Sequence, residues 1–331
     1  MSAATLRVAG AEPIRRDLTA APPAEDRRLA RGLRGAAAAT VGVLGLIGLF
    51  LLIKAWPALH RAGFGFVTEK RWLPDVNHFG IASVLEGTIV IAGIALLVAL
   101  PVAVAAALFI TEVAPPRLRT VLISVVDLMA AVPSIVYGLW GFFFLQPRLI
   151  TLSRWLAVHL GGVLPFLHVS DTDTPSSFTS SAFIVGVTLS LMVLPIATSV
   201  MRQVFGQTPT AEKEAAYALG CTRWAVVRGV VLPFGRSGIV GGAMLGLGRA
   251  LGESISVFII VSPVFAFTTH PLQSGSNTIA ALIVERAGES SDFGLAALLA
   301  AGLVLFVFTL AVNTVAGVIV ARSRSGQATE I

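Results

Sequence analysis

Two ionisable residues stand inside an apolar stretch in the last third of the chain. Arg249 and Glu253 lie four residues apart within residues 237–262. Charged groups are costly in hydrocarbon, so such residues face protein or water and mark candidate ion pathways. Arginine binds an oxyanion with two parallel hydrogen bonds. The two residues are therefore candidates for an ion pathway. If the ion is an oxyanion, Glu253 can pair with Arg249 when the anion is absent.

Hydroxyl side chains in the apolar segments are secondary candidates to donate hydrogen bonds to the same anion. The candidates are Ser83, Thr88, Ser134 and Ser254. The alternative for Arg249 and Glu253 is a static ion pair that only holds helices together. The sequence favours the pathway, because ionisable residues within membrane segments are usually functional.

Small residues recur at every fourth position of the same stretch. They are Gly238, Gly242, Gly246 and Ala250. This spacing is typical of membrane helices that approach one another closely. At 100° per residue, Arg249 and Glu253 both fall about 20° from this stripe. We therefore expect both charges to face other protein or water.

The composition indicates that these segments lie in a membrane. Hydrophobic residues make up 55% of the chain and charged residues only 13%, against about 25% charged residues in a soluble domain. Apolar runs of about 20 residues suffice to cross a bilayer as helices. The sequence predicts an all-α polytopic membrane protein with about six transmembrane helices, at 36–56, 82–113, 120–145, 182–204, 237–262 and 293–321. Three of these helices contain an internal proline, Pro101, Pro133 or Pro195, and we expect kinks there.

The distribution of Lys and Arg predicts the orientation. Sixteen of the 24 basic residues fall on the segments that lie inside if the N-terminus is inside, and seven fall on the other side. Both termini are therefore expected in the cytoplasm. Residues 1–35 read as a largely disordered basic tail, of which 25–35 could form a helix on the lipid surface. Residues 36–322 form the membrane domain, and 323–331 a second cytoplasmic tail.

Several function classes are excluded or disfavoured. The chain has no Gly-Lys pair and hence no Walker A loop, and its one cysteine, Cys221, cannot form an internal disulfide. The histidines lack metal-ligand spacing, and no nucleophile and base are arranged for catalysis. Basic residues flank the spans and form no nucleic-acid patch. We expect no enzyme, no cofactor, no metal and no nucleic-acid partner.

The inner loop 202–236 carries the most informative pattern. Glu212–Ala218 favours a helix, and Gly220 supplies the left-handed conformation that ends it. A second helix is expected from Thr222 to about Val231, with Pro233 ending it. The loop is thus predicted to be a helical hairpin below the membrane.

This hairpin resembles the coupling loop of ABC importer permeases. The resemblance rests on Glu214, Ala215, Ala216, Gly220, Val230, Val231, Leu232 and Pro233 at the spacing of that motif. It implies that the loop inserts into a groove of a separate ATPase subunit, with the small alanines permitting close approach. The alternative is a cytoplasmic hairpin that has no partner.

Further stretches are similar to the PstC-type permeases of phosphate importers. They are Phe66-Val67-Thr68, Trp72-Leu73-Pro74, residues 111–119 (TEVAPPRLR), residues 132–138 (VPSIVYG) and residues 246–253 (GLGRALGE). The sequence departs from such permeases at Ser254-Ile255-Ser256, where Thr-Met-Ala is frequent.

The resemblance implies a type I ABC importer permease fold and a role as one permease subunit of an ATP-driven phosphate importer in the bacterial inner membrane. The implied partners are phosphate, membrane lipids, a PstA-like sister permease, two PstB-like ATP-binding subunits and a PstS-like phosphate-binding protein. We expect the sister to pair through the glycine-lined fifth span. The outer segments 57–80, 147–180 and 263–292 are expected to receive the binding protein.

Two rival functions remain open. The substrate could be another oxyanion, such as sulfate or molybdate. Alternatively, the chain could be a proton-driven carrier that works alone, which would leave the coupling motif unexplained.

Overall fold

A computed structural model describes residues 24–261 and 270–323. The predicted tails are residues 1–35 and 323–331, and of these, residues 1–23 and 324–331 lie outside the described residues. The chain divides into two units, residues 1–49 and 50–331. Helix α1, Ala24–Ala62, runs through the boundary between them, so the expected basic helix at 25–35 and the first predicted span form one continuous helix.

The fold is all-helical apart from one short hairpin, as predicted. Among the described residues, five helices are long and apolar enough to cross a membrane, or six if one bent pair is counted as a span. The five are Glu25–Ala62, Ala82–Val113, Ser134–Leu160, Ala182–Gly206 and Asp292–Ile319. The bent pair joins Arg223–Phe234 to Arg236–Gly252 at an angle of 65°.

The third predicted span is wrong as a single helix. Helix α4, Pro116–Ala131, ends before an extended Val132, and α5, Ser134–Trp140, begins after Pro133. Proline disfavours helical conformation in the preceding residue. After the break the helix continues through a π-helical turn, Gly141–Leu145, into α6, Gln146–Leu160. By contrast, Pro101 and Pro195 lie inside α3, Ala82–Leu108, and α7, Ala182–Gly206.

The fifth predicted span is also interrupted. Helix α11, Arg236–Gly252, ends at an extended Glu253, and the short helix α12, Ile255–Ile260, follows. The placement of Glu253 on the glycine stripe of a continuous helix is therefore wrong. The chain re-enters the described region at residue 270 and forms α13, Ile279–Arg286, before the long α14, Asp292–Ser323.

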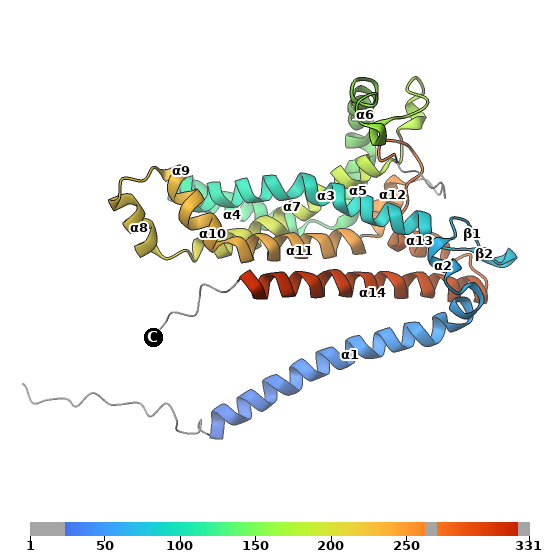
Figure 1. The fold of residues 1–331 in the computed structure, drawn as a ribbon, viewed down its shortest axis with the longest axis horizontal. Helices are drawn as coiled ribbons and strands as arrows, with labels where there is room; N and C mark the ends of the chain where they lie inside the picture. The colour runs from blue at the N-terminus through green and yellow to red at the C-terminus, as the bar shows by residue number, and fades with distance from the viewer. Residues whose placement is uncertain (1–23, 262–269, 324–331) are drawn as a thin grey trace, which may run out of the picture. The chain divides into compact units, whose positions relative to one another are not determined.

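Helices α3, α7 and α11 pack against one another along their lengths (Figure 1). A Cβ on Gly238 would lie 2.5 Å from the Cβ of Val204 on α7, and one on Gly246 would lie 2.5 Å from Cγ1 of Val193. The glycine stripe of α11 is thus occupied by α7 of the same chain. The expectation that a sister permease pairs through this stripe is wrong.

The two ends of this bundle carry different structures (Figure 1). At one end, α7 leads into α8, Thr210–Ala218, and α9, Arg223–Val226, which continues through a π-helical turn, Val227–Val231, into α10, Leu232–Phe234. The other end holds α2, Gly65–Thr68, and the antiparallel strands β1, Trp72–Leu73, and β2, His78–Phe79. Phe79 meets Phe293 of α14 edge to face, with ring centroids 5.3 Å apart. The short 3-10 turns lie at Pro74–Val76, Pro165–Leu167 and Pro175–Ser177.

The close contact between α11 and α7 predicts a specific stability defect. Gly246→Ala adds a methyl group 2.5 Å from Cγ1 of Val193, and such overpacking costs about 1–3 kcal/mol. We expect a lower thermal unfolding midpoint for the purified chain in detergent. The double variant G246A/V193A should recover much of the loss, because the next atom of Val193, its Cβ, is 3.7 Å away.

Gly248→Ala is the matched control in the same helix. A Cβ there meets nothing within 4 Å, so the midpoint should stay unchanged or rise slightly through better helix propensity. Equal midpoints for Gly246→Ala and Gly248→Ala would contradict the packing of α11 on α7.

Candidate functional site

The two helix breaks face each other inside the bundle. Helix α12, which follows the break at Glu253, packs against α5, which follows the break at Pro133. The approach is close, since a Cβ on Gly138 would lie 2.8 Å from Cα of Ser256. In hydrocarbon, non-helical backbone is tolerated only where protein or a water-filled cavity surrounds it. Facing breaks are therefore a favourable place for a polar pathway in a membrane bundle.

Ser256 connects these two breaks. Its Oγ lies 2.8 Å from the carbonyl oxygen of Ser134 and 3.1 Å from Oε1 of Glu253, and both can accept its proton. Because a hydroxyl has one proton, the two acceptors compete for it. The Ser256 amide also donates to Glu253 Oε1, at 3.3 Å. The carboxylate thus satisfies a free N–H at the start of α12, where the helix dipole favours negative charge.

Arg249 is left without the predicted carboxylate partner. Among the described residues, Glu253 forms no ion pair with Arg249, since its carboxylate is turned towards Ser256. The Nε of Arg249 is buried and has no hydrogen-bond partner. The guanidinium also interacts electrostatically with Tyr137, whose hydroxyl donates to the carbonyl of Met129 at 2.9 Å across the first break. Arg249 therefore lies close to the facing breaks and has unused donor capacity.

The four candidate hydroxyls divide into two groups. Ser134 and Ser254 adjoin the two breaks. Ser83 and Thr88 lie on α3 and serve the backbone: Ser83 donates to the carbonyl of Lys70 at 3.3 Å. Thr88 donates to the carbonyl of Val84 at 2.6 Å and accepts from the amide of Ile279 at 3.0 Å. The structure thus gathers only Ser134 and Ser254 near Arg249 and Glu253.

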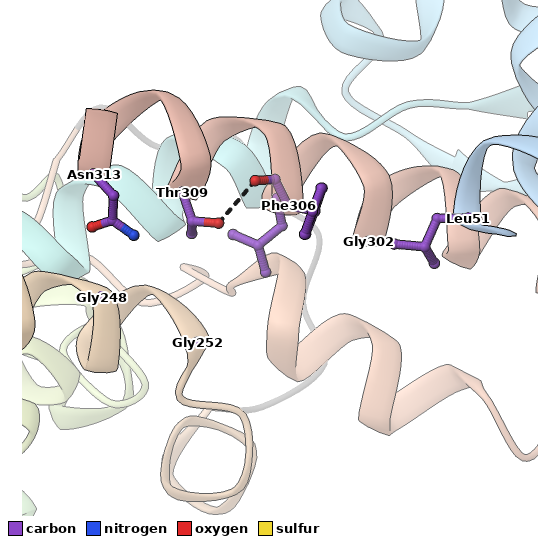
Figure 2. Close-up of a pocket in the computed structure, with 8 residues that line it drawn as sticks. Leu51, Gly248, Gly252, Gly302, Phe306, Thr309 and Asn313 are labelled. Atoms are coloured by element: carbon purple, nitrogen blue, oxygen red, sulfur yellow. Dashed lines mark hydrogen bonds between the residues drawn. The ribbon is translucent and has the colours of Figure 1, made fainter. Parts of the chain in front are cut away.

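A groove of about 450 Å³ lies between α11 and α14 (Figure 2). On α11 it is lined by Gly248 and Gly252, which flank Arg249 in the sequence and present no side chain. On α14 its polar groups are Thr309 and Asn313, of which Thr309 already donates to the carbonyl of Phe306 at 3.0 Å. Gly248 and Gly252 form an open face of α11, where an added Cβ would meet nothing within 4 Å, whereas Gly238 and Gly246 are packed against α7.

The hairpin formed by α8 and α9 has the predicted turn. Gly220 has φ +84°, and the amides of Gly220 and Cys221 donate to the carbonyls of Tyr217 and Ala216, which closes the end of α8. The hydroxyl of Thr222 then caps α9 by accepting from the amide of Ala225 at 3.3 Å. The predicted helix end at Pro233 is wrong, because the helix continues to Phe234 and bends at Gly235.

Most residues of the hairpin α8–α9 are exposed. Glu214 and Ala215 are exposed, Ala216 is half-buried, and large apolar side chains lie beside them. These are Tyr217, Leu219 and Trp224, with exposed fractions of 46%, 85% and 66%. At the far end of the motif Leu232 is partly buried and Pro233 is exposed. Sequence reasoning missed the three apolar residues, although exposed aromatic side chains in a charged loop are a usable signal of a contact surface.

An ordered turn lies at residues 171–174. The Asp171 carboxylate accepts from the amides of Asp173 and Thr174, at 3.0 and 3.2 Å. Hydrogen bonds, chiefly from Thr174, hold the pKa of Asp171 below its usual value. Arg154 pairs with Asp173 at 3.2 Å. Across residues 24–261 and 270–323, no three His, Cys, Asp or Glu side chains form a potential metal site.

Comparison of the sequence with known families identifies the family. Residues 99–325 match the family described as "Binding-protein-dependent transport system inner membrane component". The chain belongs to this family. It is therefore a multi-pass inner-membrane component of a transport system that also has an ATPase and a binding protein.

Curated relatives are phosphate transport system permease proteins, so the predicted resemblance is confirmed. PstC 2 of Mycobacterium tuberculosis is 42% identical over 81% of this chain and 83% of its own length. PstC of Xylella fastidiosa (strain Temecula1) is 41% identical over 80% of this chain and 81% of its own length. The fold is similar to chains of bacterial alginate ABC transporters, with TM-scores of 0.57 and 0.53 at 16% and 18% identity. Those matches cover 93% and 92% of this chain and 99% and 100% of the transporter chains.

The contact of Thr88 with α13 predicts a structural role for its hydroxyl. Thr88→Val leaves the buried amide of Ile279 without an acceptor, which costs about 1–3 kcal/mol. We expect faster hydrogen exchange at the start of α13, by about tenfold for each 1.4 kcal/mol. Thr88→Ser keeps the hydroxyl and should retain the slow exchange. If Thr88→Val leaves exchange at α13 unchanged, the hydroxyl does not fix this contact.

Proposed function

We propose that this chain is one permease subunit of an ATP-driven phosphate importer, forming half of the translocation pathway. The observation that carries the proposal is the buried, unpartnered Nε of Arg249 beside two facing helix breaks. Phosphate carries one to two negative charges at neutral pH and matches the donor geometry of a guanidinium. The phosphate permeases among the relatives support this choice of anion.

Arg249 has the main role in this pathway. Its cationic guanidinium attracts the anion into a region where an isolated charge is costly. Ser134 and Ser254 lie near enough to the breaks to donate further hydrogen bonds as the backbone moves. Glu253, held by Ser256, does not neutralise Arg249 in this conformation. The original hypothesis of a pair that opens is therefore replaced by a guanidinium that is already available to the anion.

The orientation follows from the basic residues. We propose that both termini and the hairpin α8–α9 lie in the cytoplasm, and that residues 36–322 form the permease domain. The sequence predicts that the outer segments 57–80, 147–180 and 263–292 face the binding protein. Residues 147–160 belong to the candidate span Ser134–Leu160, so we propose 57–80, 161–180 and 263–292 for this role. Residues 262–269 of the last segment are outside the described structure.

The partners follow from this arrangement. A PstA-like sister permease would complete the pathway, two PstB-like subunits would hydrolyse ATP, and a PstS-like protein would deliver phosphate. Closure of an ATPase subunit would act on Glu214, Ala215 and Ala216 and on the apolar side chains next to them. Exposed apolar residues with a charged rim are suited to such a contact, since the charges fix its register.

Transport by Arg249 variants tests the pathway. In proteoliposomes with the full complex, Arg249→Ala should lower ATP-dependent uptake of labelled phosphate at least about tenfold, the equivalent of about 1.4 kcal/mol of lost anion stabilisation. Arg249→Lys keeps the charge but loses the fork geometry, so an intermediate rate is expected. Assembly and basal ATP hydrolysis should be unchanged in both variants.

The matched control is Arg28→Ala, which removes an exposed guanidinium near the start of α1. Normal uptake by Arg249→Ala in intact complexes would make Arg249 structural. Competition by unlabelled sulfate or molybdate as strong as that by phosphate would favour another oxyanion. Uptake that an uncoupler abolishes and ATP depletion does not would favour a proton-driven carrier.

The left-handed turn at Gly220 provides a test of coupling. An alanine at φ +84° carries about 1–2 kcal/mol of backbone strain. We expect Gly220→Ala to weaken retention of the ATP-binding subunits in pull-down assays and to lower uptake several-fold. Gly93→Ala, in an open position of α3, should retain both. Full retention and uptake in Gly220→Ala would show that the turn geometry is not required.

A further inference from the structure

Helix α8 is held to the rest of the protein by few contacts. None of its residues is buried, and it packs mainly against α9. Hydrophobic burial therefore contributes little to its position. Within the described residues, Lys213 is the one side chain of α8 that forms a hydrogen bond or ion pair, and its partner is in another helix.

That partner is Glu112, 101 residues earlier in the chain. The Nζ of Lys213 lies 2.6 Å from Oε1 of Glu112, and the two side chains are only 19% and 13% exposed. An ion pair shielded to this degree is screened less than a surface pair. Removal of one partner leaves the other charge poorly solvated. The contact is therefore suited to hold α8 in one position relative to α3.

Glu112 belongs to the π-helical turn Phe109–Val113 that ends α3. Such turns are frequent at functional sites. From this turn, α3 packs along α7, as shown by Gly186, where a Cβ would lie 2.6 Å from Cγ2 of Ile94. At the opposite end of α3, Thr88 binds the amide of Ile279 at the start of α13. Helix α3 is thus a continuous rigid element between the hairpin and the segment before α13.

We propose that the Lys213–Glu112 ion pair transmits movement of the coupling helix α8 to α3. Both are positioning residues, since neither is placed on the anion pathway. The proposal rests on the proposed function, in which an ATPase subunit moves α8. Without the ion pair, α8 would follow the ATPase while α3 stays behind, and ATP would be hydrolysed without import.

Transport measurements on the reconstituted full complex test this role. Lys213→Met and Glu112→Gln should each lower phosphate imported per ATP by about tenfold, with ATP hydrolysis within about twofold of wild type. The charge-swapped double variant K213E/E112K should recover most of the ratio. Arg117→Gln, which removes an exposed charge from the same inner loop, is the control and should behave as wild type.

A merely stabilising ion pair predicts a different result. It would lower the amount of folded complex but leave the ratio of phosphate to ATP unchanged in what remains. An unchanged ratio in both single variants, or a swap no better than the single variants, would overturn the proposal.

A distance measurement separates this inference from the proposed function. Spin labels on the native, exposed Cys221 and on Thr120→Cys at the start of α4 report the position of the hairpin in the full chain. We expect a narrow distance distribution for the unaltered pair and the swap, and a broad one for Lys213→Met and Glu112→Gln. Identical distance distributions in the wild type, the charge swap and the two single variants would overturn the proposal, even if wild type imports phosphate. If wild type imports no phosphate, the proposed function fails, and these distributions still decide whether the ion pair fixes α8.

Discussion

The rest of this structure depends on the need to satisfy backbone polar groups inside the membrane. A continuous helix does so by itself, whereas a broken one exposes N–H and C=O groups that hydrocarbon cannot solvate. Here two breaks lie against each other, and the hydrogen bond from the Ser256 hydroxyl to the carbonyl of Ser134 joins them. The Tyr137 hydroxyl serves the carbonyl of Met129, while the Ser256 hydroxyl and the Glu253 carboxylate serve Ser134 and the start of α12. Each break is tolerated because hydrogen bonds satisfy its backbone groups, and one of these bonds comes from the other break.

This arrangement determines what the charged residues can do. If α11 had continued past Gly252, Glu253 would lie one turn from Arg249, and the two charges would largely neutralise each other. The break instead turns the Glu253 carboxylate towards an N-terminal amide. A positive charge with unused donors is then left in the bundle, and an anion can complement it. The same end of α11 presents Gly248 and Gly252 to a groove against α14.

Hydropathy and residue spacing predicted the elements that depend on local sequence. The helices near 182–204 and 293–321 and the left-handed turn at Gly220 agree with the structure. Pro133 predicted a kink, but neither the complete break there nor the one at Glu253 follows from hydropathy and spacing. Pro101 and Pro195 remain inside helices, so a proline alone does not determine whether a helix breaks. The deciding contact, Gly138 against Ser256, is tertiary, as is the pairing of Lys213 with Glu112.

The close packing also restricts how the protein can move. A Cβ added at Gly186, Gly238 or Gly246 would clash with the neighbouring helix, so α3, α7 and α11 are closely packed. Closely packed interiors transmit displacement instead of absorbing it. These three helices are therefore expected to move as one body. Flexibility must then lie where the helical pattern changes, at the two breaks, at the bend of Gly235 and at the π-helical turns. A displacement of the hairpin would reach the surroundings of Arg249 by reorientation at these joints, while the packed bundle between them keeps its shape.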